Sequence, residues 1–224
     1  APENVQSVQF RFEYYYRYFS TCQIDDFVLT TNLYFGEGYP YTPGAGAAAS
    51  LSTGGIQLFE STYNGDFHSV GDSMDVVLEN SAILVNEARD KDSHGLGLYA
   101  DHVNLSTTNS TVSGHGLDGI HIESLTTAWT DQNGLVEGNG ADGISVNGNL
   151  DLDATELDVI GNGLDGISVN GDLDLDATEL DVNGNGERGI NTGSNSNISL
   201  FGSRIQENGA HGIFALSGST LDLD

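Results

Sequence analysis

The chain has 224 residues and a formal net charge of −27 at pH 7, because six lysines and arginines face 33 aspartates and glutamates. This charge excludes nucleic acid as a natural partner and disfavours anionic membrane surfaces. No stretch of the sequence is long and apolar enough to predict membrane insertion. A single cysteine, Cys22, cannot supply a disulfide framework within the chain.

Residues 1–55 differ in kind from the rest of the chain. From Val8 to Tyr18, apolar and aromatic residues alternate with polar ones, which predicts one long strand. The small-residue run Gly44–Ser50 predicts a linker or a tight packing segment. Because a solenoid needs covered ends, we expect a Tyr-rich cap over the first coil, or alternatively a strand donated to a neighbouring subunit.

Residues 56–224 repeat with a near-fixed period, and the regular pattern starts at about residue 75. The dipeptide Gly-Ile, or Gly-Leu in its first copy, returns at intervals of 24, 24, 23, 23 and 23 residues. The segments Asp142–Val159 and Asp165–Val182 are almost identical. A fixed period of this size predicts a solenoid, in which each repeat buries its apolar face against its neighbours.

Each repeat contains short runs in which apolar and polar residues alternate. Ile167 and Val169 flank Ser168, and Leu173 and Leu175 flank Asp174 in the same way. Period-2 alternation interrupted by Asn-Gly turns predicts three short strands per repeat and leaves no room for an amphipathic helix. The predicted fold class is all-β, a parallel β-helix whose coils stack about 4.8 Å apart.

An asparagine occupies the same corner of four successive repeats, at Asn139, Asn162, Asn185 and Asn208. We expect their side chains to hydrogen-bond in a ladder from coil to coil. Asparagine also tolerates the left-handed backbone that a sharp corner needs. The glycine that follows each asparagine removes the β-carbon where the chain bends.

Two other repeat folds fit the sequence less well than the β-helix does. A leucine-rich repeat also carries an asparagine, and Ala154–Leu164 fits its pattern loosely. Glu187 and Ala210 replace Leu164 in later repeats, however, and that fold leaves the Gly-Ile-Ser-Val segments unexplained. A calcium β-roll requires nonapeptide repeats. The parallel β-helix is therefore favoured over both.

With its Asn-Gly-x-x-Gly-Ile repeats, the chain resembles the pectin-lyase-like superfamily of right-handed parallel β-helices over roughly residues 75–224. That superfamily includes polysaccharide lyases, polygalacturonases, alginate epimerases, phage tailspikes and passive surface proteins. The resemblance therefore implies the fold, and it leaves enzymatic and structural functions open.

Acidic residues recur at equivalent positions of the two near-identical repeats, so like charges are expected about 5 Å apart. Such pairs repel by roughly 1 kcal/mol in water. High ionic strength would screen the repulsion, and bound Ca²⁺, which prefers oxygen ligands, would neutralise it. A simply solvated acidic face is the alternative. The candidate calcium ligands are Asp151, Asp153, Asp174 and Asp176.

The best candidate site lies in two neighbouring coils, with Asp90, Asp92 and His94 in one and His115, Asp118, His121 and Glu123 in the next. Asp90, Asp92 and the segment Ser113–Gly116 resemble the paired-aspartate and Gly-His-Gly motifs of polygalacturonases, although the Arg-Ile-Lys segment of that family is missing. The resemblance implies that Asp90 and Asp92 activate water and protonate the leaving oxygen, with His115 assisting. His115 also stands where later repeats have the ladder asparagine, and a departure from a local rule marks a candidate functional position.

Two further positions are candidates for binding. His121 and Glu123 alternate with Ile120 and Ile122, so both are expected to point outward, as a metal-binding pair or as a solvated pair. Trp129, the single tryptophan, is expected on a flank of the β-helix. There it could stack on a sugar, or pack against a loop or a partner chain.

These features favour a secreted, cell-surface or virion protein. The near-identical repeats carry no active-site cluster, and the sequence ends mid-coil at Leu221–Asp224, so we expect either a longer protein or another chain to complete that coil. We therefore expect a non-enzymatic structural module, a fibre component or an adhesin, that self-associates head to tail through its N-terminal strand. The alternative is a polysaccharide-active enzyme (a hydrolase, lyase or epimerase) or a tailspike-like glycan-binding protein.

Overall fold

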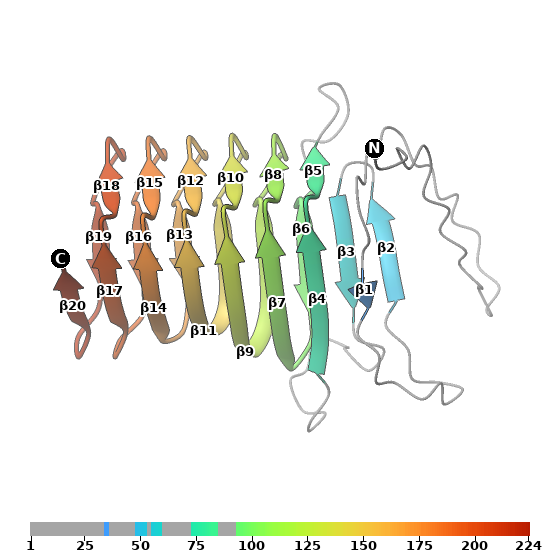
Figure 1. Cartoon of the computed structure of the whole chain (residues 1–224), viewed down its shortest axis with the longest axis horizontal. Helices are drawn as coiled ribbons and strands as arrows, with labels where there is room; N and C mark the ends of the chain where they lie inside the picture. Colours follow the sequence, from blue (N-terminus) through green and yellow to red (C-terminus); the bar gives the residue numbers. More distant parts are fainter. Residues whose placement is uncertain (1–33, 36–47, 53–54, 60–72, 85–92) are drawn as a thin grey trace, which may run out of the picture.

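The described part of the chain is all-β (Figure 1). The N-terminal strand predicted from Val8 to Tyr18 and the candidate catalytic residues Asp90 and Asp92 lie outside the described residues. The computed structural model describes residues 34–35, 48–52, 55–59, 73–84 and 93–224.

The regular coils have three sides, here called A, B and C, each built from a stack of parallel strands (Figure 1). Side A follows the Gly-Ile dipeptide, side B carries the paired aspartates, and side C precedes the corner with the asparagines. Strands β9 (Ile120–Gln132) and β11 (Ile144–Thr155) run through sides A and B without a break. Side A also contains β6 (Leu96–Tyr99), β13 (Ile167–Val169), β16 (Ile190–Thr192) and β19 (Ile213–Ala215). Side B also contains β4 (Ser73–Glu79), β7 (His102–Thr108), β14 (Leu173–Thr178), β17 (Asn197–Phe201) and β20 (Thr220–Leu223). Side C consists of β5 (Ala82–Leu84), β8 (Thr111–Ser113), β10 (Leu135–Glu137), β12 (Asp158–Ile160), β15 (Asp181–Asn183) and β18 (Arg204–Gln206).

Three short strands precede the regular coils. β3 (Gly55–Phe59) pairs in parallel with β6, and β2 (Ala48–Ser52) pairs with β3 in the antiparallel direction. β1 (Tyr34–Phe35) is antiparallel to β4. Antiparallel pairing in the described residues is thus confined to β1 and β2, and the coils themselves are parallel throughout.

Equivalent residues of successive repeats pair with each other. Ile144 pairs with Ile167 and Ile167 with Ile190, while Val159 pairs with Val182 on side C. Side C forms one sheet of six strands, so the solenoid has about six turns. The predicted parallel β-solenoid is confirmed. A leucine-rich repeat is excluded, because its repeats need a helical segment and none occurs in the residues that the structure describes.

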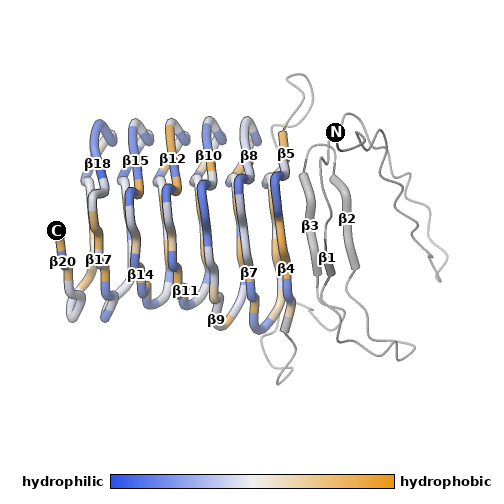
Figure 2. Tube along the Cα trace, in the orientation of Figure 1, coloured by the Kyte–Doolittle hydropathy of each residue, from blue (hydrophilic) through white to orange (hydrophobic). Residues whose placement is uncertain are grey.

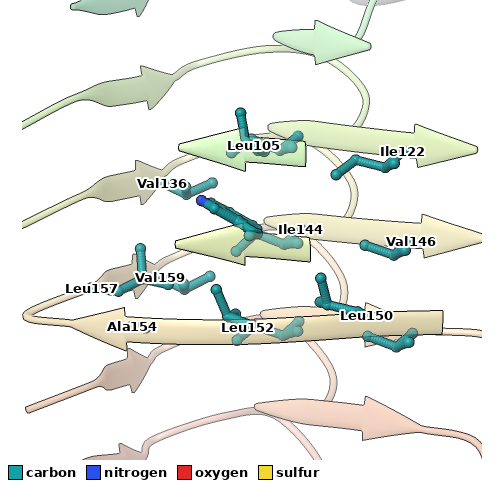
Figure 3. Packing of buried hydrophobic residues seen from close by; sticks show 14 of the residues in the cluster. Leu105, Ile122, Val136, Ile144, Val146, Leu150, Leu152, Ala154, Leu157 and Val159 are labelled. Atoms are coloured by element: carbon teal, nitrogen blue, oxygen red, sulfur yellow. The ribbon is translucent and has the colours of Figure 1, made fainter. Parts of the chain in front are cut away.

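The interior is a continuous stack of aliphatic side chains. In β14 the residues alternate strictly, with Leu173, Leu175 and Ala177 buried. Figure 2 shows the resulting mixture of hydrophobic and hydrophilic residues along the coils, and Figure 3 shows side chains such as Ile144 and Leu152 filling the space inside them. Burying one such leucine contributes about 1.5–3 kcal/mol, and stacked neighbours provide the burial that a single repeat lacks.

The corner between sides B and C uses one residue with left-handed backbone in every coil. Glu156 and Glu179 have φ angles of 57° and 56°, a conformation that costs a non-glycine residue roughly 1–2 kcal/mol. Gly202, with φ of 61° at the same position of the next coil, avoids that cost because it has no β-carbon. The corner residues are Asn80, Asn109, Asn133, Glu156, Glu179 and Gly202.

At the corner between sides C and A, the asparagines do not have the left-handed backbone that was expected of them. Asn162 does not have left-handed backbone; the residue before it, Gly161, does, with φ of 65°. The glycine after the asparagine is needed for close approach, because a β-carbon on Gly163 would lie 2.2 Å from the carbonyl oxygen of Gly140. The sequence therefore indicated the right corner, but the left-handed residue precedes the asparagine.

Candidate functional site

The asparagines at the corner between sides C and A are bonded from coil to coil. Asn162 Oδ1 accepts hydrogen bonds from Nδ2 and the backbone N–H of Asn139, at 2.9 and 3.1 Å. Its own Nδ2 donates to Asn185 Oδ1 at 3.0 Å and to the carbonyl of Val136 at 3.3 Å. Asn208 continues the pattern, since its Oδ1 accepts two bonds of 3.0 Å from Asn185. With its polar atoms used in this way, the asparagine ladder is an internal structural element.

His115 is the first member of the asparagine ladder. Its backbone N–H donates to Asn139 Oδ1 at 3.0 Å, and its ring Nε2 lies 3.1 Å from the carbonyl oxygen of Ile83. The residue is only 1% exposed. Because a general acid or base must reach its substrate, this burial argues against the catalytic role expected for His115.

Trp129 lies inside the solenoid, which corrects its expected place on a flank. It is 2% exposed and pairs with Leu152 of the next coil. Its indole Nε1 donates to Thr107 Oγ1 at 2.7 Å; Thr107 donates to Asp131, and Asp131 Oδ2 accepts from the N–H of Gly134 at 3.0 Å. An indole buried in this network cannot stack on a sugar at the surface.

The paired aspartates form an acidic patch on side B, defined by Asp151, Asp153, Asp174 and Asp176. Asp151 pairs with Asp174, and Asp153 with Asp176, and all four are exposed. Partial burial, and then the charges of Asp153 and Asp174, raise the pKa of Asp151. The residues that follow on β17 are uncharged. The patch is therefore two coils deep.

A second side-chain ladder, not anticipated from the sequence, lies at the residue before each Gly-Ile. Asp118 Oδ1 accepts from the N–H of Asp142 at 3.0 Å, Asp142 Oδ1 from Asp165 at 2.9 Å, and Asp165 Oδ1 from Arg188 at 2.8 Å. At the start of this aspartate ladder, the N–H of Asp118 donates to His94 Nδ1 at 3.2 Å. The sequence did contain a signal for this ladder, because the residue before the Gly-Ile or Gly-Leu dipeptide is polar in every repeat.

The head of the aspartate ladder brings two histidines onto one carboxylate. Asp118 Oδ2 lies 3.2 Å from His94 Nδ1 and 2.9 Å from His121 Nδ1. The two imidazole rings stack, with centroids 4.2 Å apart and an interplanar angle of 19°. Among the described residues, this cluster is the one place where three or more metal-ligating side chains bring donor atoms within 4.8 Å of one another.

Two more side chains border this His94–Asp118–His121 cluster. His121 Nε2 lies 3.5 Å from Glu123 Oε1, so this imidazole stands between two carboxylates. The ring of Tyr99 lies 5.8 Å from that of His121, tilted by 46°. The side chains of His94, Asp118 and His121 are 18%, 11% and 15% exposed, which leaves the cluster partly desolvated and still open to solvent ions. The predicted outward direction of His121 and Glu123 is compatible with this arrangement.

The cluster shifts its own protonation equilibria. Burial alone would raise the pKa of Asp118, but its contacts with His121 and His94 and a hydrogen bond from the backbone of Asp142 lower it well below its usual range. Burial would lower the pKa of His121, yet its contacts with Asp118 and Glu123 outweigh burial and raise it. Asp118 is therefore a carboxylate at neutral pH.

Asp142, one coil further on, has the opposite shift. Burial first, and then the charges of Asp118, Asp165 and Glu187, raise the pKa of Asp142 to about 6, against one hydrogen bond from the Asp165 backbone that lowers it. The next member of the ladder, Asp165, forms an ion pair, because Arg188 Nη1 lies 3.3 Å from its Oδ2. Asn191 Nδ2 donates a hydrogen bond to the same oxygen at 2.9 Å. The ladder thus changes from histidine partners at one end to an arginine partner at the other.

The fold and the two ladders define an acidic parallel β-solenoid with one His–Asp–His cluster among its described side chains. Compared with known proteins, the chain matches no family model, no curated sequence and no solved structure. Across the described residues, no helix has the length and apolarity needed to cross a membrane.

Proposed function

We propose that the chain is a non-enzymatic structural module of an extracellular, cell-surface or virion assembly, such as a fibre component or an adhesin. The observation that carries this proposal is the outward face of β11 and β14, where Asp151, Asp153 and Thr155 stand in register with Asp174, Asp176 and Thr178. A catalytic site needs different groups in one asymmetric arrangement. Repeated identical side chains suit a rod-like spacer or a repeating binding surface.

The asparagine ladder supports a structural role. It also supports the relationship to the pectin-lyase-like superfamily that the repeats suggest. Its buried amides fix each coil on the next, which is what a rigid extended module requires. We infer that the solenoid is a right-handed β-helix of the pectin-lyase-like type; the spacing of about 23 residues between paired strands and the internal asparagines support this inference.

The polysaccharide-active alternative needs a group that can reach a glycan. His115 is buried, so the imidazoles left near that coil in the described residues are those of His94, His102 and His121. The negative charge of the chain would also repel a polyuronate unless cations bridge the two. The acidic patch provides oxygen ligands for such cations, and Ca²⁺ is accordingly the proposed stabilising ion of the module.

An activity assay separates these two functions. The chain is incubated with polygalacturonate and alginate, with and without Ca²⁺, and new reducing ends and unsaturated products are measured. We expect neither product. Turnover that disappears in His121→Ser or in Asp92→Ala would overturn the structural proposal and establish the enzymatic one.

Self-association is measured separately by light scattering and electron microscopy. We propose that copies join head to tail through the N-terminal segment, so removal of residues 1–20 should abolish assemblies that the intact chain forms. Unchanged assembly after this deletion would contradict strand donation and would leave the segment a cap.

A further inference from the structure

The His94–Asp118–His121 cluster gathers its three donors from two adjacent coils. His94 directly precedes the Gly-Leu dipeptide at β6, Asp118 directly precedes the Gly-Ile dipeptide at β9, and His121 lies within β9. The strands are held in register by parallel pairing, which aligns Leu96 with Ile120. The backbones of all three donors are therefore set by the solenoid and not by a free loop, as a preorganised ligand site requires.

The distances match those between donors that share one ion. With metal–nitrogen and metal–oxygen bonds of about 2.0–2.2 Å, neighbouring ligands of a tetrahedral ion lie roughly 3.3–3.5 Å apart. Asp118 Oδ2 is 3.2 Å from His94 Nδ1 and 2.9 Å from His121 Nδ1. Both distances are slightly shorter than that, so the rotation of one ring together with shifts of a few tenths of an ångström would open the space that a small ion needs.

The groups around the cluster direct Asp118 Oδ2 and His121 Nδ1 toward each other, whereas His94 Nδ1 accepts the N–H of Asp118 and would exchange that bond for the metal ion. Asp118 Oδ1 is already occupied by the N–H of Asp142 at 3.0 Å, and this leaves Oδ2 to face the histidines. Glu123 lies 3.5 Å from His121 Nε2, so a proton on Nε2 can be held there while Nδ1 faces Asp118. A carboxylate behind a ligating histidine fixes its tautomer and its ring direction in metal sites.

The next coils show what the scaffold itself requires. The position of His121 is taken by Ser145 and then Ser168, and the ladder position of Asp118 by Asp142 and Asp165. Those coils keep the backbone-to-aspartate bonds without any imidazole. The two histidines are therefore additions to a ladder that folds without them.

We propose that His94, Asp118 and His121 bind one divalent transition-metal ion of the zinc type, with Glu123 as the carboxylate that positions His121. Two imidazoles and one carboxylate form a donor set that suits Zn²⁺, Co²⁺, Ni²⁺ or Cu²⁺, whereas Ca²⁺ and Mg²⁺ prefer oxygen alone. This site is distinct from the acidic patch, where all the donors are oxygens, and it does not depend on the structural function proposed above.

Binding has a structural consequence that can be observed. A metal ion lies near the plane of each imidazole that ligates it, and two rings stacked 4.2 Å apart cannot both point their planes at one ion. At least one ring must rotate out of the stack. The ring protons of His94 and His121 should therefore shift in NMR spectra when Zn²⁺ is added, and those of the buried His115 should move much less.

The test uses the full chain and Co²⁺ as a spectroscopic probe, with Zn²⁺ as competitor. We expect one Co²⁺ per chain, visible absorption bands of a low-coordinate site, and their loss on addition of one equivalent of Zn²⁺ but not of Ca²⁺. The variants His121→Ser and His94→Asp place at each position the residue that the following coil has there, so folding should be kept. His121→Ser removes a donor and should weaken Co²⁺ and Zn²⁺ binding by on the order of 100-fold. His94→Asp exchanges a nitrogen donor for an oxygen donor, and Glu123→Gln removes a supporting charge, so each should weaken binding by on the order of 10-fold.

The matched control is His211→Ala, which removes an exposed histidine at the same ladder position of the last coil. This variant should bind both metals as the unaltered chain does. The proposal is overturned if the unaltered chain shows no saturable site, if His121→Ser and His94→Asp bind as tightly as it does, or if Ca²⁺ displaces Co²⁺ at equal concentration.

Discussion

The coils around β11, β12, β14 and β15 differ from the coils around β6 and β9, although both belong to the same parallel solenoid. In the first region, residues 142–182, successive coils repeat the same side chains inside and outside. In the second, His115 replaces an asparagine, Trp129 replaces a leucine, and His94 and His121 surround Asp118. The repeated coils show the minimum that the solenoid needs, and the departures from them mark what has been added.

Two of the additions are internal and one is at the surface. His115 and Trp129 are 1% and 2% exposed, and both use their ring nitrogens on groups within the solenoid. The His94–Asp118–His121 cluster is the departure that solvent ions can reach. Irregularity along a repeat is therefore a guide to function only after burial has separated packing substitutions from accessible ones.

The largest effect is expected from breaking the regular region at its ladder. Asn162→Ala removes the acceptor of two bonds from Asn139 and leaves buried donors without partners, which should lower the free energy of unfolding by about 3 kcal/mol. Urea denaturation followed by circular dichroism measures it. Asn170→Ala is the control, because its exposed side chain makes one bond to Asn147 and its loss should cost less than about 0.5 kcal/mol. Equal losses in the two variants would refute the structural importance of the ladder.

The second prediction concerns pH and the junction of the two regions. Burial raises the folded-state pKa of Asp142 to about 6, above the ordinary value of an aspartate, so its contribution to stability is fully present below about pH 4 and is lost as the pH rises through 6. Asp142→Asn should therefore stabilise the chain at pH 7, by roughly 1–2 kcal/mol after allowance for solvent screening, and have little effect at pH 4.

Thermal melts of both proteins across this pH range provide the measurement. Asp222→Asn, which changes the charge equally at an exposed position, is the control. If Asp142→Asn raises the melting temperature by the same amount at pH 4 and pH 7, burial of this carboxyl does not govern the pH dependence of stability.

The third prediction concerns the acidic patch, which has no counterpart on the β7 and β9 strands of side B. Each registered pair should repel by about 1 kcal/mol at low ionic strength. Molar NaCl should therefore raise the melting temperature, and Asp174→Asn should reduce that rise. Melts in EDTA, in CaCl₂ and in NaCl distinguish the mechanisms: stabilisation by Ca²⁺ alone indicates specific sites, and an unchanged melting temperature in all three indicates simple solvation.

The smallest effect is expected at the corner between sides B and C. Glu179→Gly places glycine where the next coil already has Gly202, and it should stabilise the chain by about 0.5–1 kcal/mol by removing left-handed strain. Chemical denaturation measures this difference. Glu187→Gly, at a position without positive φ, should instead destabilise by increasing the freedom of the unfolded chain. Destabilisation by Glu179→Gly would show that its side chain makes contacts worth more than the strain.

The sequence by itself determined the period, the parallel stacking and the inward residues, because strand alternation has a period of two and each repeat must bury its face on the next. It also located the asparagine ladder, since identical side chains at a fixed period stack. Only the tertiary structure decided which way the corners turn. In the structure Gly161, and not Asn162, has left-handed backbone, and Trp129 lies inside the solenoid. His94 and His121 both contact the carboxylate of Asp118. The sequence placed these residues in neighbouring coils, but contacts across a corner depend on backbone angles that hydrophobic periodicity does not encode. Only the structure could show which of the side chains touch.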